Sequence, residues 1–246
     1  MIDAKFFLCE PKSYEGKCYV YPPKVREMIA DDHFPLYRKI LTISQEEVED
    51  IYVEKKIEGN FPTPFEYLFV NAYNSKEVEA LTKKAFEFFL HEPVNFIYEE
   101  KKIVIGDLAQ ILKGAQSMKD FRIIEEQDFF GLQNLIRESL GEKTIDPPNP
   151  GEHPRVKKMK AKARYRDKIK AKQKDGLGLT AFLASICCMK IGLNPLNVGE
   201  ISYAAAQLLL RYYQEQEKYE TDIRSLLAGA SSKKIKPKYW IRNIED

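Results

Sequence analysis

Cysteine, histidine and paired acidic residues are the side chains in this sequence whose chemistry could support catalysis or bind a metal. The four cysteines, at positions 9, 18, 187 and 188, lack the C-x-x-C spacing that typifies a zinc site. Cys187 and Cys188 lie in an apolar run, which predicts buried thiols that act as small hydrophobic side chains. Free thiols of this kind are typical of a reducing compartment.

The three histidines, His33, His91 and His153, are far apart in the sequence, and His91 has the context of a helix end. The sequence contains no G-x-S-x-G, H-E-x-x-H, Walker or G-x-G-x-x-G motif. We therefore expect no catalytic residues, no metal site and no cofactor, and we predict that the chain is not an enzyme. The acidic pairs are interpreted as solvent-facing, with general acid–base catalysis as the alternative; they are residues 46–47, 99–100 and 125–126.

Charge is unevenly distributed along the chain. The sequence contains 39 Lys and Arg against 37 Asp and Glu, which gives a net charge of +2. Residues 155–174 contain eleven Lys and Arg and one acidic residue, Asp167, so this segment carries +10 and the remainder −8. The balanced total argues against binding nucleic acid through bulk charge, whereas the segregated pattern predicts one basic surface.

Three interpretations of the basic segment at 155–174 stay open. It could contact phosphates, although no nucleic-acid-binding signature surrounds it, and nucleic acid is the least favoured partner. It could dock an acidic partner protein, or it could be an exposed arm whose aliphatic stems cover apolar surface. It could also pair with acidic parts of its own chain or of a neighbouring copy. The candidate partner-binding residues in this segment are Lys160, Arg164, Tyr165, Arg166, Lys168 and Lys170.

The elements that must position these residues are mainly helical. Residues 1–43 are expected to be irregular, with extended pieces near 6–8 and 18–21 and a short helix near 25–30. Capping sequences then predict helices that begin after Ser44, Thr63 and Ser75, and alternation over 94–105 predicts a β-hairpin. A further helix is predicted from Asp128 to Leu140, with Gly141 as its stop. The predicted fold class is therefore mainly α with a small β-hairpin, comprising an α+β N-terminal region and an all-α C-terminal region.

A proline-rich stretch divides the chain. We predict an N-terminal mixed α+β region at 1–145, a linker at 146–154, and a helical C-terminal region at 155–246 with a basic helix and an aromatic tail. The apolar helix expected after the basic helix covers 179–191. A long helix is expected from Asn197 to Leu227, with Glu200 in a capping box and a wide apolar stripe facing the core.

The aromatic tail consists of Tyr239, Trp240 and Ile241 and follows a polar stretch rich in lysine and serine. Aromatic side chains carry much of the binding energy of protein interfaces, so the tail is a candidate docking peptide. The alternative is that Trp240 folds back onto the long helix and completes its core.

Several strings in the last 120 residues resemble, as a set, the tail assembly chaperones of bacteriophages that infect Gram-positive bacteria. The resemblance covers residues 120–246, and the strings are FFGLQNLIR at 129–137, KAKARYRDKIKAK at 160–172, SICCM at 185–189, NPLNVGE at 194–200, DIRSLLAGA at 222–230 and KYWIRN at 238–243. It implies a non-enzymatic protein of the host cytoplasm that binds the tape-measure protein, helps to recruit tail-tube subunits and is absent from the mature virion. Self-association is left open.

Two alternative functions stay open beside the chaperone. One is a structural component of the virion, such as a baseplate or hub subunit. The other is a regulator that binds nucleic acid through the basic helix. The sequence has no run of about 18 apolar residues, so we expect no membrane span.

Overall fold

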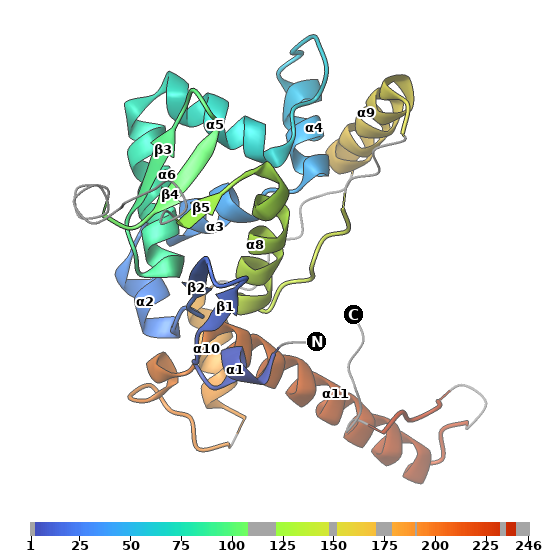
Figure 1. The fold of residues 1–246 in the computed structure, drawn as a ribbon. Helices are drawn as coiled ribbons and strands as arrows, with labels where there is room; N and C mark the ends of the chain where they lie inside the picture. Colours follow the sequence, from blue (N-terminus) through green and yellow to red (C-terminus); the bar gives the residue numbers. More distant parts are fainter. Residues whose placement is uncertain are drawn as a thin grey trace.

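The structure is a computed structural model that describes residues 3–107, 122–147, 152–170, 179–189, 191–231 and 235–239; for 168–170 and 179 it describes the backbone alone. Over these residues the chain is mainly helical with two small antiparallel sheets, which confirms the predicted fold class (Figure 1). The linker predicted at 146–154 lies partly outside the described residues, and the division into two regions stays a prediction.

The N-terminal segment is more regular than expected. The extended piece expected at residues 6–8 is wrong, because helix α1 (Ala4–Phe7) occupies this position. The Asp3 carboxylate accepts a hydrogen bond from the Lys5 N–H at 2.9 Å and thereby caps the helix. Strands β1 (Lys12–Tyr14) and β2 (Cys18–Val20) follow as an antiparallel pair.

Two helices complete the first 43 residues. Helix α2 (Val25–Ala30) is the predicted short helix. Helix α3 (Phe34–Thr42) is a correction to the irregular chain expected here, and it buries Phe34, Tyr37 and Leu41 on one face. Its N-terminus has Pro35 in the first turn but lacks a side-chain cap, so the capping signal that marks other helix starts is missing here.

The three predicted caps are confirmed. Ser44 begins α4 (Gln45–Glu54), Thr63 begins α5 (Pro64–Asn74) and Ser75 begins α6 (Lys76–Leu90). Each hydroxyl accepts a hydrogen bond from the backbone N–H three residues later. This bond satisfies one of the donors that a helix start leaves free.

The predicted hairpin is confirmed as β3 (Val94–Ile97) and β4 (Lys102–Ile105), with Val94 opposite Ile105. A third strand, β5 (Arg122–Ile124), pairs with β4 and places Ile124 opposite Ile103. At three residues, β5 is too short for an alternating pattern to be visible in the sequence.

One large core joins the three-stranded sheet to helices α3, α5, α6 and α8 (Glu126–Ser139). Helix α8 is the helix predicted at 128–140. The side chains at the centre of this core are aromatic or branched, so they fill the space between the sheet and the helices. The largest of the fully buried ones are Phe6, Leu41, Phe65, Phe86, Phe89, Leu90, Ile103, Ile105, Ile124, Leu132, Ile136 and Leu140.

Helix α8 makes a close approach to β1 at Gly131. A Cβ atom at Gly131 would lie 2.6 Å from Tyr14 Oη and 2.9 Å from its Cε2. The Tyr14 hydroxyl donates a hydrogen bond to the Asp128 carbonyl oxygen at 2.7 Å, so the ring is held in place. Only glycine leaves room for this ring.

We expect Gly131→Ala to lower the free energy of unfolding by about 1–2 kcal/mol, because the new methyl group displaces Tyr14 and its hydrogen bond. In an ordinary helix interior the same change stabilises by about 1 kcal/mol. In a Tyr14→Ala background the substitution should therefore become stabilising. Urea denaturation of the four proteins measures both effects, and stabilisation by Gly131→Ala in the presence of Tyr14 would contradict the prediction.

The C-terminal end of α3 is held by side chains of α8. The buried Gln133 amide donates to the carbonyl oxygens of Leu41 at 3.1 Å and Ile43 at 2.7 Å. One turn later, Arg137 donates to the Thr42 carbonyl oxygen at 2.7 Å. The last carbonyls of a helix have no partner within the helix, so α8 supplies donors for this end of α3.

The C-terminal helices are α9 (Pro154–Lys170), α10 (Leu179–Cys187) and α11 (Tyr203–Leu227), with a 3-10 turn, η2 (Val198–Glu200), before α11. The basic helix predicted at 155–174 is confirmed as far as Lys170, and 171–174 lie outside the described residues. Helix α10 ends before the predicted residue 191.

The predicted start of the long helix at Asn197, with a capping box at Glu200, is wrong. Ile201 is extended, with φ −81° and ψ 154°, and Ser202 caps α11 instead. The backbone at 201–203 pairs with 23–25: Val25 N–H donates to Ile201 O at 3.0 Å and Tyr203 N–H to Pro23 O at 2.9 Å. This pairing takes residue 201 out of any helix.

The wide core-facing stripe predicted on the long helix is confirmed only at its start. Ala204, Ala205 and Ala206 are buried, and Ala206 belongs to a second, smaller core that includes Val25 and Ile186. Figure 1 shows the rest of α11 extending away from the main body. The later stripe positions are half-buried, because few elements cover them: Leu208, Tyr212, Tyr219, Ile223 and Leu226.

Candidate partner-binding site

The basic helix α9 lies against α4, as Figure 1 shows, and one arginine makes the principal polar contact. Arg164 Nη2 is 2.6 Å from Glu49 Oε2, its Nε is 3.3 Å from Asp50 Oδ1, and its Nη1 is 3.5 Å from Glu46 Oε1. Ala161, one turn earlier, is fully buried, and this small side chain lets the helices approach closely. The predicted pairing of the basic segment with acidic parts of its own chain is therefore present at Arg164.

The acidic side of this contact is built by helix spacing. Glu46, Glu49 and Asp50 are three and four residues apart, which places them on one face of α4. Glu49 and Asp50 are buried, and their charge is compensated by the guanidinium. Burial alone would lower the pKa of Arg164, but the hydrogen bond to Glu49 and the three carboxylates raise it overall.

The other predicted residues of the basic helix differ in their surroundings. Lys160 is exposed and pairs with Glu152. Tyr165 is half-buried and Arg166 is exposed. Lys168 and Lys170 lie on α9, and their side chains are outside what the structure describes.

The aromatic tail is described only as far as its first member. The Tyr239 ring lies edge-on to the ring of Tyr219 on α11, with centroids 5.7 Å apart, and Tyr239 is 58% exposed. Trp240 and Ile241 lie outside the described residues. Tyr239 therefore contacts α11, whereas Arg164 of α9 contacts α4.

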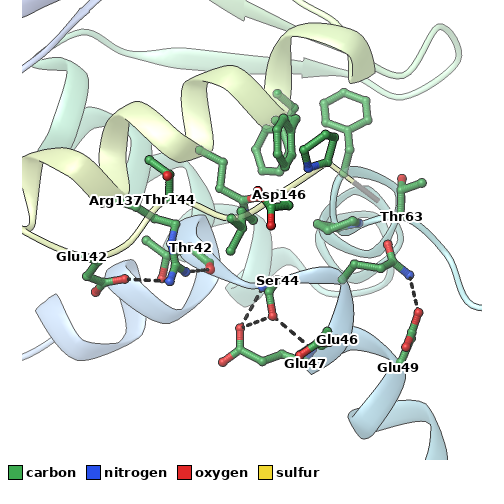
Figure 2. A pocket seen from close by; sticks show the side chains of 18 of the residues that line it. Thr42, Ser44, Glu46, Glu47, Glu49, Thr63, Arg137, Glu142, Thr144 and Asp146 are labelled. Atoms are coloured by element: carbon green, nitrogen blue, oxygen red, sulfur yellow. Dashed lines mark hydrogen bonds and ion pairs between the residues drawn. The ribbon is translucent and has the colours of Figure 1, made fainter. Parts of the chain in front are cut away.

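A groove of about 1120 Å³ lies beside the contact between α9 and α4. Figure 2 shows Ser44, Glu46 and Glu47 on one side of it and Arg137 and Glu142 on another. Lys157, Lys160 and Arg164 line it from α9, so this face of the basic helix is turned toward the groove. Its charged lining combines acidic and basic side chains, several of which pair with each other.

The chain segment that leads from α8 toward α9 forms part of the groove wall. Asn134 binds the backbone of Ile145 twice: its amide donates to the carbonyl oxygen at 3.1 Å, and its carbonyl accepts from the N–H at 2.8 Å. Arg137 also donates to the Lys143 carbonyl oxygen at 2.7 Å. These bonds hold this part of the groove wall in place.

The acidic residues of α4 are the functional candidates that sequence reasoning missed. Glu46 and Glu47 are exposed, as predicted, although Glu46 also contacts Arg164; Glu49 and Asp50 were not singled out. The i, i+3, i+4 spacing of the three acids on α4 was a visible signal. It did not identify α9 as the partner, because 115 residues separate Glu49 from Arg164.

The cysteines are all free thiols, and their burial differs from expectation. The predicted burial of Cys187 and Cys188 is wrong: Cys188 is exposed, and Cys187 is only half-buried against the core that Ile186 of α10 and the following Met189 enter. Cys18 is the buried thiol, and its burial raises its pKa to about 12.

We expect Cys188 to react with a thiol reagent much faster than Cys18, because the Cys18 thiol is buried and its raised pKa leaves little of the reactive thiolate. Cys18 should react only as fast as the protein unfolds. Alkylation at pH 8 followed by mass spectrometry of the peptides measures both rates. Equal alkylation rates of Cys18 and Cys188 in the folded protein would contradict the described burial.

Among the described residues, no group of three or more His, Cys, Asp or Glu side chains is placed to hold a metal ion. No helix in the same part of the chain combines the length and apolarity needed to cross a membrane. No family model, curated protein or solved structure matches this chain.

Proposed function

We propose that this protein is a non-enzymatic assembly chaperone of a bacteriophage tail, which binds the tape-measure protein and helps to recruit tail-tube subunits in the host cytoplasm. The observation that carries the proposal is the set of strings between residues 129 and 243 that resembles such chaperones. Under this proposal the protein is absent from the mature virion.

The described surface offers features that suit a client-binding protein. The groove beside α9 is large enough for a segment of another chain, and its wall is fixed by hydrogen bonds. The distal half of α11 keeps apolar side chains half-exposed, and Tyr239 lies beside it. Half-exposed apolar side chains on a long helix favour binding of another helix by groove contacts.

Co-expression with the tape-measure protein of the same genome tests the proposal. We expect the soluble yield of the tape-measure protein to rise and the two proteins to co-purify. The matched negative control is the tape-measure protein expressed with an unrelated helical protein of similar size. Unchanged solubility together with absence of co-purification would overturn the proposal.

The alternative functions give different results. A structural baseplate or hub subunit should be found by mass spectrometry in purified particles, whereas a chaperone should be lost from them. A nucleic-acid-binding regulator should bind duplex DNA with an affinity that falls steeply with salt.

A further inference from the structure

Helix α9 has two basic faces, of which only one is turned toward the rest of the protein. A helix repeats every 3.6 residues, so Lys157, Lys160 and Arg164 share the face that lines the groove. A second set occurs at intervals of three and four residues on the opposite side, and we call it the outer basic row: Arg155, Lys158, Lys162 and Arg166. All four are exposed, and their side chains form no ion pair with any other described residue.

We propose that the outer basic row binds an acidic helix of a partner protein, whose carboxylates recur at the same intervals of three and four residues. This inference rests on the proposed function and specifies the surface and the partner chemistry for client binding. The inner face of α9 already binds a helix of this kind, because Arg164 holds Glu46, Glu49 and Asp50 of α4. A second acidic helix on the outer row would use the same charge complementarity.

An exposed apolar side chain beside the outer basic row favours a protein partner over nucleic acid. Met159 lies between Arg155 and Lys162 on the outer face and is 72% exposed. Methionine adapts its shape to apolar surfaces and is enriched in protein interfaces, whereas a phosphate backbone offers it no such surface. A partner helix with one apolar residue among its carboxylates would cover Met159 and pair with the cations around it.

The charge around α9 also disfavours nucleic acid. The row spans roughly 16 Å along the helix axis, which matches a short helix. Acidic residues of α4, together with Glu152 and Asp167, lie on or beside α9, and the chain outside 155–174 carries −8. A broad polyanion would approach these carboxylates as well as the row, and like charges repel.

The test uses a fluorescent helical peptide of 20 residues with four glutamates at intervals of three and four and one leucine at the centre of their row. We expect it to bind the full chain, with an affinity that weakens as salt screens the charges. In the row variant, Arg155→Gln, Lys158→Gln, Lys162→Gln and Arg166→Gln are combined, and the Kd should rise by at least about tenfold. Fluorescence anisotropy measures the Kd.

Two matched controls make the test specific. The control variant removes four exposed lysines outside α9, Lys55, Lys76, Lys84 and Lys218, by substitution with glutamine, and its Kd should change by less than about twofold. A peptide of the same composition with its glutamates spread around the helix should bind more weakly than the row peptide. Equal losses in both variants, or equal binding of both peptides, would overturn the proposal.

A DNA duplex tested in parallel separates the two partner classes. Tighter binding of the duplex than of the peptide, lost in the row variant, would overturn the acidic-helix proposal in favour of nucleic acid. The failure of each proposal is also distinguishable. If the row variant still co-purifies fully with the tape-measure protein, the proposal that the outer basic row binds the partner is overturned, and the chaperone function is not. If the peptide binds specifically to the row but the protein has no effect on the tape-measure protein, the chaperone function is overturned.

Discussion

Replacing Arg164 with alanine is expected to detach α9 from α4 while the rest of the protein stays folded. Arg164 pairs with the buried carboxylates of Glu49 and Asp50 and thereby compensates much of their charge. Loss of one partner of such a contact weakens the compensation of buried charge, and the protein can avoid this cost by exposing both acids to water. The cost of the substitution is therefore limited to the free energy with which α9 docks.

We expect this docking free energy to fall by about 2 kcal/mol. The loss is smaller than for a fully buried ion pair, because the Arg164 guanidinium is partly exposed. Amide protons of α9 should then exchange about 30-fold faster, since a detached helix of this length is only marginally stable. Hydrogen exchange followed by mass spectrometry measures the change, while the urea midpoint of the main core should move little.

Arg166→Ala is the matched control, because Arg166 is on the same helix, two residues away, and is exposed. It should leave the exchange of α9 unchanged. The charge-swapped pair Arg164→Glu with Glu49→Arg should recover part of the protection that either single change removes. Unaltered exchange in Arg164→Ala would show that packing around Ala161, rather than charge, holds α9.

Gln133→Leu is expected to lower the free energy of unfolding by about 2–3 kcal/mol, although it places an apolar side chain of similar size in a buried position. The Gln133 amide is the donor for the carbonyl oxygens of Leu41 and Ile43, and the substitution leaves both without it. Each buried carbonyl that loses its donor costs about 1–3 kcal/mol. Part of this cost is offset, because Gln133 Oε1 is itself buried without a partner in the described structure.

Urea denaturation measures the effect as a lower midpoint with an unchanged slope. Gln127→Leu on the same helix is the matched control: Gln127 is exposed, and its replacement should change stability by less than about 0.5 kcal/mol. A gain in stability from Gln133→Leu would mean that hydrophobic burial outweighs the two hydrogen bonds at the end of α3.

Three helix starts and the hairpin were predicted correctly because residues close together in the sequence specify them. Ser44, Thr63 and Ser75 each form a hydrogen bond to a backbone group three residues away, so the cap can be identified from a few adjacent residues. The hairpin at 94–105 was predictable for the same reason, because its two strands alternate and are joined by a short connection.

Elements that depend on distant parts of the chain were missed or misplaced. Helix α3 has no capping side chain at its start and is held at its end by Gln133, more than 90 residues away in sequence from Leu41. The long helix begins at Tyr203 rather than at Asn197, because backbone pairing with residues 23–25 keeps Ile201 extended.

The candidate site divides in the same way. The sequence by itself determined that one helix concentrates the positive charge, because charge and helical periodicity are properties of consecutive residues. Only the tertiary structure decided which of these cations are already used. It brings Arg164 to Glu49 across 115 residues and leaves Arg155, Lys158, Lys162 and Arg166 exposed on the opposite face. The physical reason is that pairing depends on which side of α9 faces α4, and burial against a distant helix selects that side.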